Sequence, residues 1–76
     1  MQLYRVVYDK NTIWGTTDNL DGLRGLCQYL LNSTRDDLVG GYMIYARGAD
    51  NFDISLTDFC NENGIKKQTF EERMGL

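Results

Sequence analysis

The spacing of hydrophobic residues divides the chain into strand-like and helix-like stretches. Residues 3–8 are rich in β-branched and aromatic side chains, and turn-forming residues separate them from a similar stretch at 12–16. These two stretches predict an N-terminal β-hairpin. Two further short strands are predicted at 42–46 and 52–54, because a glycine-containing turn lies between them.

Between the two predicted hairpins, apolar residues recur with a helical period. The stripe over 19–32 predicts one amphipathic helix. Its candidate N-caps are Thr17, Asp18 and Asn19, whose side chains can accept hydrogen bonds from the first turn.

Two more helices are predicted after the last strand. Ser55 begins the first of them, and Gly64 ends it because glycine tolerates a left-handed backbone. The second is predicted over 67–74, with Phe70 and Met74 facing inward at a spacing of i, i+4.

These elements predict a single α+β domain spanning 1–76. Residues 1–55 supply the hairpin, the amphipathic helix and the second hairpin or strand, and residues 56–76 supply a helical pair. A chain of 76 residues has room for one core only. Its 42% hydrophobic and 25% charged residues are typical of a folded domain and argue against wholesale disorder.

Charge and composition restrict the function. Eight Lys and Arg residues oppose eleven Asp and Glu residues, and the net charge of −3 disfavours diffuse binding to nucleic acid or to an anionic membrane. Histidine is absent, which removes histidine triads and histidine metal sites. No phosphate-binding glycine loop and no paired nucleophile and base are evident. We therefore expect no enzymatic activity, no cofactor and no metal.

The two cysteines, Cys27 and Cys60, lie in apolar helical patterns and form no CxxC pair. We expect buried, reduced thiols, with a disulfide as the alternative. The N-terminus lacks the features of a signal peptide, and no apolar run approaches the roughly 20 residues of a membrane span. The expected location is cytoplasmic, without membrane association.

One segment near the C-terminus carries a recognisable pattern. Cys60 is a small residue in the first predicted helix, Gly64 follows four residues later, Ile65 is apolar, and Phe70 is apolar six residues beyond the glycine. With this pattern, the segment 56–76 resembles a helix-turn-helix of the DNA-binding kind. The resemblance covers about a quarter of the chain. A purely structural pair of helices needs a similar pattern and remains the alternative.

The resemblance implies a set of nucleic-acid contacts. In a helix-turn-helix the second helix, called the recognition helix, contacts DNA. By the resemblance, the residues at its entry are Lys66, Lys67 and Gln68, and Arg73 lies near its end. Glu71 and Glu72 lie on the same predicted helix and would repel phosphates, so the segment has a net charge of −1.

Aromatic residues suggest a different surface. Four aromatic residues on predicted strands are assigned to partner binding: Tyr4, Trp14, Tyr42 and Tyr45. One helix covers only one face of a sheet, so we expect several rings on the other face, where Tyr and Trp often dominate interfaces. The alternative is that the C-terminal helices cover that face.

The two surfaces give two functional hypotheses. The first is a small non-enzymatic modulator that binds a protein through its aromatic sheet face and acidic loops. Its size and acidity are typical of small proteins of phages and mobile elements, including inhibitors of host systems, which is an analogy only. The alternative is a DNA-associated regulator that uses residues 66–73. Homo-oligomer formation stays open in both.

Overall fold

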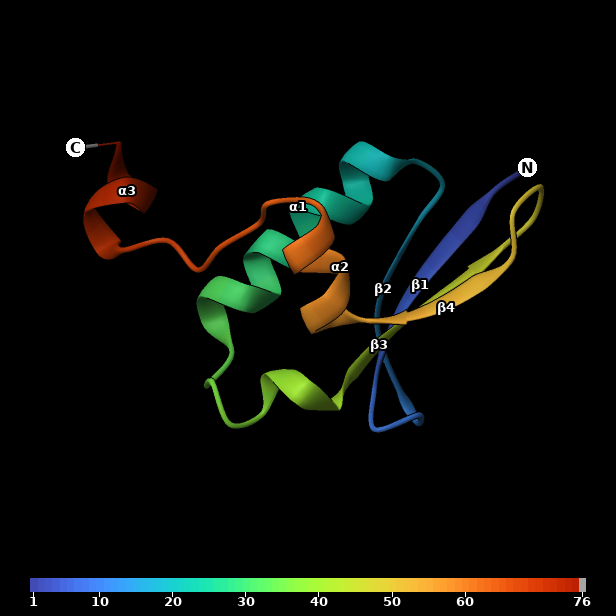
Figure 1. Cartoon of the computed structure of the whole chain (residues 1–76), viewed down its shortest axis with the longest axis horizontal. Helices are drawn as coiled ribbons and strands as arrows, with labels where there is room; N and C mark the ends of the chain where they lie inside the picture. The colour runs from blue at the N-terminus through green and yellow to red at the C-terminus, as the bar shows by residue number, and fades with distance from the viewer. Residues whose placement is uncertain (76) are drawn as a thin grey trace.

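The hydrophobic stretches form one antiparallel sheet, and helices pack on one of its faces in the computed structural model (Figure 1). The structure describes residues 1–75, and it confirms a small α+β fold. The strand order is β2-β1-β3-β4. The elements in chain order are β1 (Leu3–Tyr8), β2 (Thr12–Thr17), α1 (Leu20–Ser33), a 3₁₀ turn (Val39–Gly41), β3 (Tyr42–Arg47), β4 (Phe52–Ser55), α2 (Leu56–Glu62) and α3 (Phe70–Met74).

The first hairpin closes through a turn with left-handed backbone. Asp9 and Lys10 have φ of 51° and 66°, and the Asn11 N–H donates to the Tyr8 carbonyl at 3.2 Å. Two consecutive residues with positive φ match the right-handed twist of paired strands. The turn therefore sets the pairing of β1 with β2, while β1 also pairs with β3 along its whole length.

Helix ends lie where side chains satisfy the free backbone groups. The Asn19 side chain accepts from Gly22 N at 2.7 Å, and Ser55 accepts from Asp58 N at 3.1 Å. Gly64 has φ of 66°, and the Ile65 N–H donates to the Cys60 carbonyl at 2.9 Å. These contacts confirm the predicted starts of α1 and α2 and the predicted end of α2.

The core lies between the sheet and the two longer helices. It takes the even-numbered residues of β1 and β3 and the inner faces of α1 and α2. Its buried members are Tyr4, Val6, Leu23, Cys27, Leu30, Val39, Tyr42, Ile44, Ala46, Leu56, Phe59 and Cys60.

Both cysteines lie in this core as free thiols, as predicted. Burial raises the pKa of Cys27 to about 12, and the neighbouring Cys60 adds to the increase. Burial also raises the pKa of Cys60. The two thiols are therefore uncharged at neutral pH and act as small apolar side chains.

The C-terminal helix differs from the prediction. α3 begins at Phe70 and not at residue 67, because Thr69 and Glu72 form a reciprocal capping box that fixes the start. Phe70 and Met74 are 66% and 61% exposed, so the prediction that they face inward is wrong. The helix lies beyond the end of α1, away from the sheet (Figure 1), where no core is close enough to receive them.

Candidate binding face of the sheet

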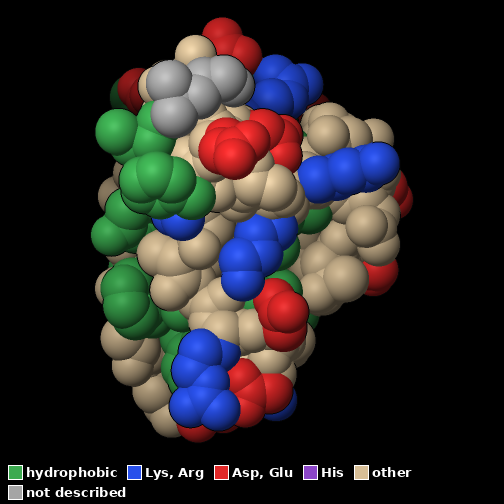
Figure 2. All heavy atoms as spheres, turned by 90° about the vertical axis from the view of Figure 1, so that its left-hand side faces the viewer, with side chains coloured by type: hydrophobic (Ala, Val, Ile, Leu, Met, Phe, Trp, Pro, Cys, Tyr) green, Lys and Arg blue, Asp and Glu red, His purple; other side chains and the backbone are tan. Residues whose placement is uncertain are grey.

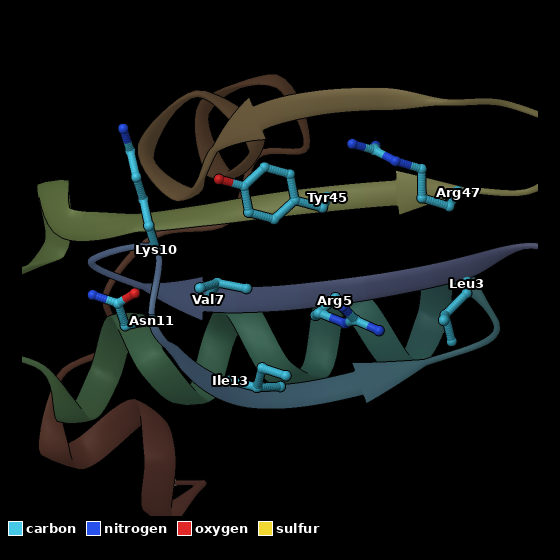
Figure 3. Close-up of a pocket in the computed structure, with 8 residues that line it drawn as sticks. All are labelled: Leu3, Arg5, Val7, Lys10, Asn11, Ile13, Tyr45 and Arg47. Atoms are coloured by element: carbon cyan, nitrogen blue, oxygen red, sulfur yellow. The ribbon is translucent and has the colours of Figure 1, made fainter.

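One face of the sheet carries no helix among residues 1–75, and we call it the open face. Both α1 and α2 lie against the other face (Figures 1 and 3). The odd-numbered residues of β1 and β3 point outward here, because side chains alternate along a strand. The open face includes Leu3, Arg5, Val7, Ile13, Met43, Tyr45, Arg47 and Asp53.

The open face is hollowed, with a volume of about 420 Å³. Its floor includes Val7, which is buried although it lies outside the main core cluster. Tyr45 of β3 and Ile13 of β2 lie on either side of this valine in Figure 3. The lining residues are Leu3, Arg5, Val7, Lys10, Asn11, Ile13, Tyr45 and Arg47.

The rim of the hollow is basic. Arg5, Lys10 and Arg47 are three of the eight basic residues of the chain, and none of the lining residues is acidic. Arg47 pairs with Asp53 at 2.8 Å and lies 5.8 Å from the centre of the Tyr45 ring. Within residues 1–75, Arg5 and Lys10 have no carboxylate within ion-pair distance. An acidic chain thus presents a local positive surface.

The structure separates the four aromatic residues assigned to partner binding. Tyr4 and Tyr42 are buried in the core beneath the helices, so the prediction that they lie on an exposed face is wrong. They share the strand face of Ile44, which α1 and α2 cover. Tyr45 has the opposite parity and does lie on the open face.

Trp14 lies at a β-bulge in the edge strand β2. Its neighbours Ile13 and Gly15 pair with consecutive residues of β1, which leaves Trp14 as the extra residue. The indole is 51% exposed, and its ring centre lies 6.1 Å from that of Tyr42. Trp14 is accessible, but it borders the core side of the edge and not the hollow.

The C-terminal basic residues do not lie at the entry of a helix. Residues 65–69 belong to no helix or strand, and Gln68 forms two hydrogen bonds of 2.8 and 3.1 Å with Asn32 of α1. Lys67 lies 3.4 Å from the Asp36 carboxylate. Lys66 is exposed, and Arg73 is exposed on α3. The end of the molecule that carries α3 shows basic and acidic side chains interspersed, with hydrophobic side chains along one edge (Figure 2).

Sequence reasoning missed the basic residues of the open face. The signal was present, because Arg5 alternates with buried residues in β1 and Arg47 shares the parity of Tyr45 in β3. The pairing of β1 with β3 brings them onto one surface, and that pairing joins segments about 40 residues apart.

No group of three or more potential metal ligands occurs among the described residues. None of the helices within residues 1–75 has both the length and the apolar character needed to cross a membrane. Comparison of the chain with protein-family models, curated proteins and solved structures found no match.

Proposed function

We propose that the protein is a small non-enzymatic module that binds a protein partner through the open face. The observation that carries this proposal is a hollow with an apolar floor and a basic rim on an uncovered sheet. Apolar side chains of a partner fit over Val7 and Ile13, and acidic side chains fit beside Arg5 and Lys10. A role as an inhibitor of a host system, by analogy of size and charge with small phage proteins, is the biological setting that we propose for it.

Tyr45 is the expected anchor of this interface. It is partly buried, stands beside the floor of the hollow and has the large rigid side chain that interface hot spots favour. Arg5 is the expected electrostatic contact, since it is exposed and lies on the central strand β1. A partner that fits has an acidic segment carrying apolar side chains.

The test compares partner capture by the wild type with capture by two tyrosine variants, in the presence of nuclease. Tyr45→Ala should weaken capture at least about fivefold, because loss of a hot spot costs more than about 1 kcal/mol. Tyr29→Ala is the matched control, since Tyr29 is exposed on α1 and away from the open face. Equal capture by both variants would exclude the open face as the interface.

The alternative proposal is a DNA-associated regulator that uses Lys66 and Lys67. Its support is that these two basic residues are adjacent and exposed. It ranks second because the interspersed acidic residues of that end (Figure 2) oppose phosphate binding.

A charge reversal tests this alternative. Lys66→Glu with Lys67→Glu should lower DNA affinity at all sequences and reduce the salt slope by about two. Unchanged capture of a protein partner by the same variant would favour the open face.

A further inference from the structure

The C-terminal helix α3 is a second surface without a partner. It is five residues long and has no buried residue. Phe70 and Met74 lie one turn apart on the same side, about 6 Å apart along the axis. Both side chains are more than half exposed, so the helix presents an apolar pair to solvent.

The charges of α3 flank this apolar pair. With 3.6 residues per turn, Glu71 lies about 80° to one side of the pair, Arg73 about 80° to the other side, and Glu72 on the back of the helix. Glu72 is also engaged in the capping box with Thr69. The side of the helix that can dock therefore has one acidic and one basic edge.

The open face has the complementary arrangement. Val7 and Ile13 line it with apolar side chains, and Arg5 on β1 carries a positive charge with no carboxylate within ion-pair distance among residues 1–75. On the far side of Tyr45, Asp53 of β4 carries a carboxylate that already pairs with Arg47 at 2.8 Å. Arg5, Tyr45 and Asp53 lie opposite one another in one row across β1, β3 and β4. A helix laid along β1 and β3 with its Phe70–Met74 side down can therefore place Glu71 toward Arg5, while Arg73 lies on the side of the Arg47–Asp53 pair. Adjacent strands are about 4.8 Å apart, so β1 and β4, which are separated by β3, lie about 10 Å apart. A helix with a diameter of about 10 Å is wide enough to cover this distance.

A chain cannot make this contact with itself. The segment before α3 is held on the helix side of the sheet by Gln28, which donates to the Lys66 carbonyl at 2.8 Å. Asn32 holds it as well, because its side-chain amide donates to Gln68 Oε1 and accepts from the Gln68 backbone N–H. The open face lies on the other side of the sheet (Figure 1). The helix that reaches it must come from another molecule.

We propose that α3 of a second copy of this chain occupies the open face, and that two copies exchange these helices reciprocally. Reciprocal exchange closes after two molecules and uses the same surfaces on both. The inference rests on the proposed function, because it names an occupant for the same face. The dimer is weak, since two five-residue helices cover less than a standard interface. Its formation competes with capture of another partner.

The test is the molar mass of the full chain in solution, measured by light scattering or sedimentation from about 10 µM to about 1 mM, where weak association becomes visible. The wild type should pass from monomer to dimer over this range. Phe70→Ser should weaken the dimer at least about tenfold, because each dimer loses two anchors. Tyr29→Ser is the matched control, since Tyr29 is 64% exposed and Phe70 66%. A wild type that stays monomeric at the highest concentration would overturn the inference, as would a dimer that Phe70→Ser leaves intact.

A charge exchange identifies the contact. Arg5→Glu alone and Glu71→Lys alone each place like charges together in both halves of the dimer. An equimolar mixture places opposite charges together in both halves, and the mixed dimer should be about tenfold tighter than either variant alone. No gain on mixing would overturn the placement of Glu71 beside Arg5.

The two proposals fail separately. If the wild type is monomeric while Tyr45→Ala still loses partner capture, only the exchange of helices is wrong. If Tyr45→Ala changes neither capture nor dimerisation, the open face is wrong for both. If both hold, Phe70→Ser should increase capture of the other partner, because the competing helix is removed.

Discussion

Two tyrosines three residues apart on β3 give the sharpest test of the fold, because they point to opposite faces. Tyr42 is 4% exposed and its ring centre lies 4.8 Å from that of Tyr8 in an edge-on arrangement. Tyr45 lies on the open face and is only partly buried. We expect Tyr42→Ala to destabilise the domain severely and Tyr45→Ala to leave it folded.

The magnitudes follow from burial. Truncation of a buried aromatic residue costs about 3–5 kcal/mol, including the loss of its ring contact. A domain of 76 residues has a free energy of unfolding of about 4–11 kcal/mol at typical stability per residue. Tyr42→Ala therefore removes about a quarter or more of the free energy of unfolding. Tyr45→Ala should change it by about 1 kcal/mol or less, as expected for a surface residue.

Urea unfolding followed by circular dichroism measures both effects, and thermal melting provides a second readout. Tyr42→Ala should lower the melting temperature by at least about 12 °C, at 4–8 °C per kcal/mol for a domain of this size. Tyr45→Ala should shift it by less than about 8 °C. Similar losses of stability in the two variants would refute the assignment of the two faces.

The remaining predictions concern the buried thiols and one glycine. The folded pKa of Cys27 is raised from about 9 to about 12, so the stability it contributes is complete below pH 9 and is lost as pH rises from 9 toward 12. Between pH 8 and 10.5, the free energy of unfolding measured in urea should fall less steeply with pH in Cys27→Ala than in the wild type. An equal dependence on pH in the two proteins would contradict this. Gly48 has φ of 143°, and a Cβ there would meet the Met1 carbonyl, so Gly48→Ala should cost at least about 1–3 kcal/mol. Gly25→Ala, at an open helical position, should be neutral or stabilising in the same melting assay.

Local sequence signals were sufficient for most of the fold. Asn19, Ser55 and Gly64 each act within three to five residues of their own position, so their roles follow from the sequence alone. The start of α3 was also encoded locally. Thr69 and Glu72 have the spacing of a capping box, which places the first helical residue at Phe70, whereas the helix-turn-helix pattern predicts an earlier start.

The exposed surface depends on contacts that no local pattern contains. The parity of Tyr42 and Tyr45 shows that they face opposite ways, but only the packing of α1 and α2 determines which of them is covered. In the same way, the positive hollow forms because β1 pairs with β3 and brings Arg5 beside Tyr45. The net charge of the chain gave no indication of this local concentration.

The position of β1 in the sheet has a consequence for how the chain folds. β1 starts at Leu3, yet it is a central strand, with β2 on one side and β3 on the other. The turn at Asp9 and Lys10 lets the hairpin form within microseconds, whereas pairing with β3 must close a loop that includes all of α1. During synthesis the backbone edge of β1 that pairs with β3 therefore stays unpaired until β3 has been made. We therefore expect closure of β1 onto β3 to be the slower step in the folding of this domain.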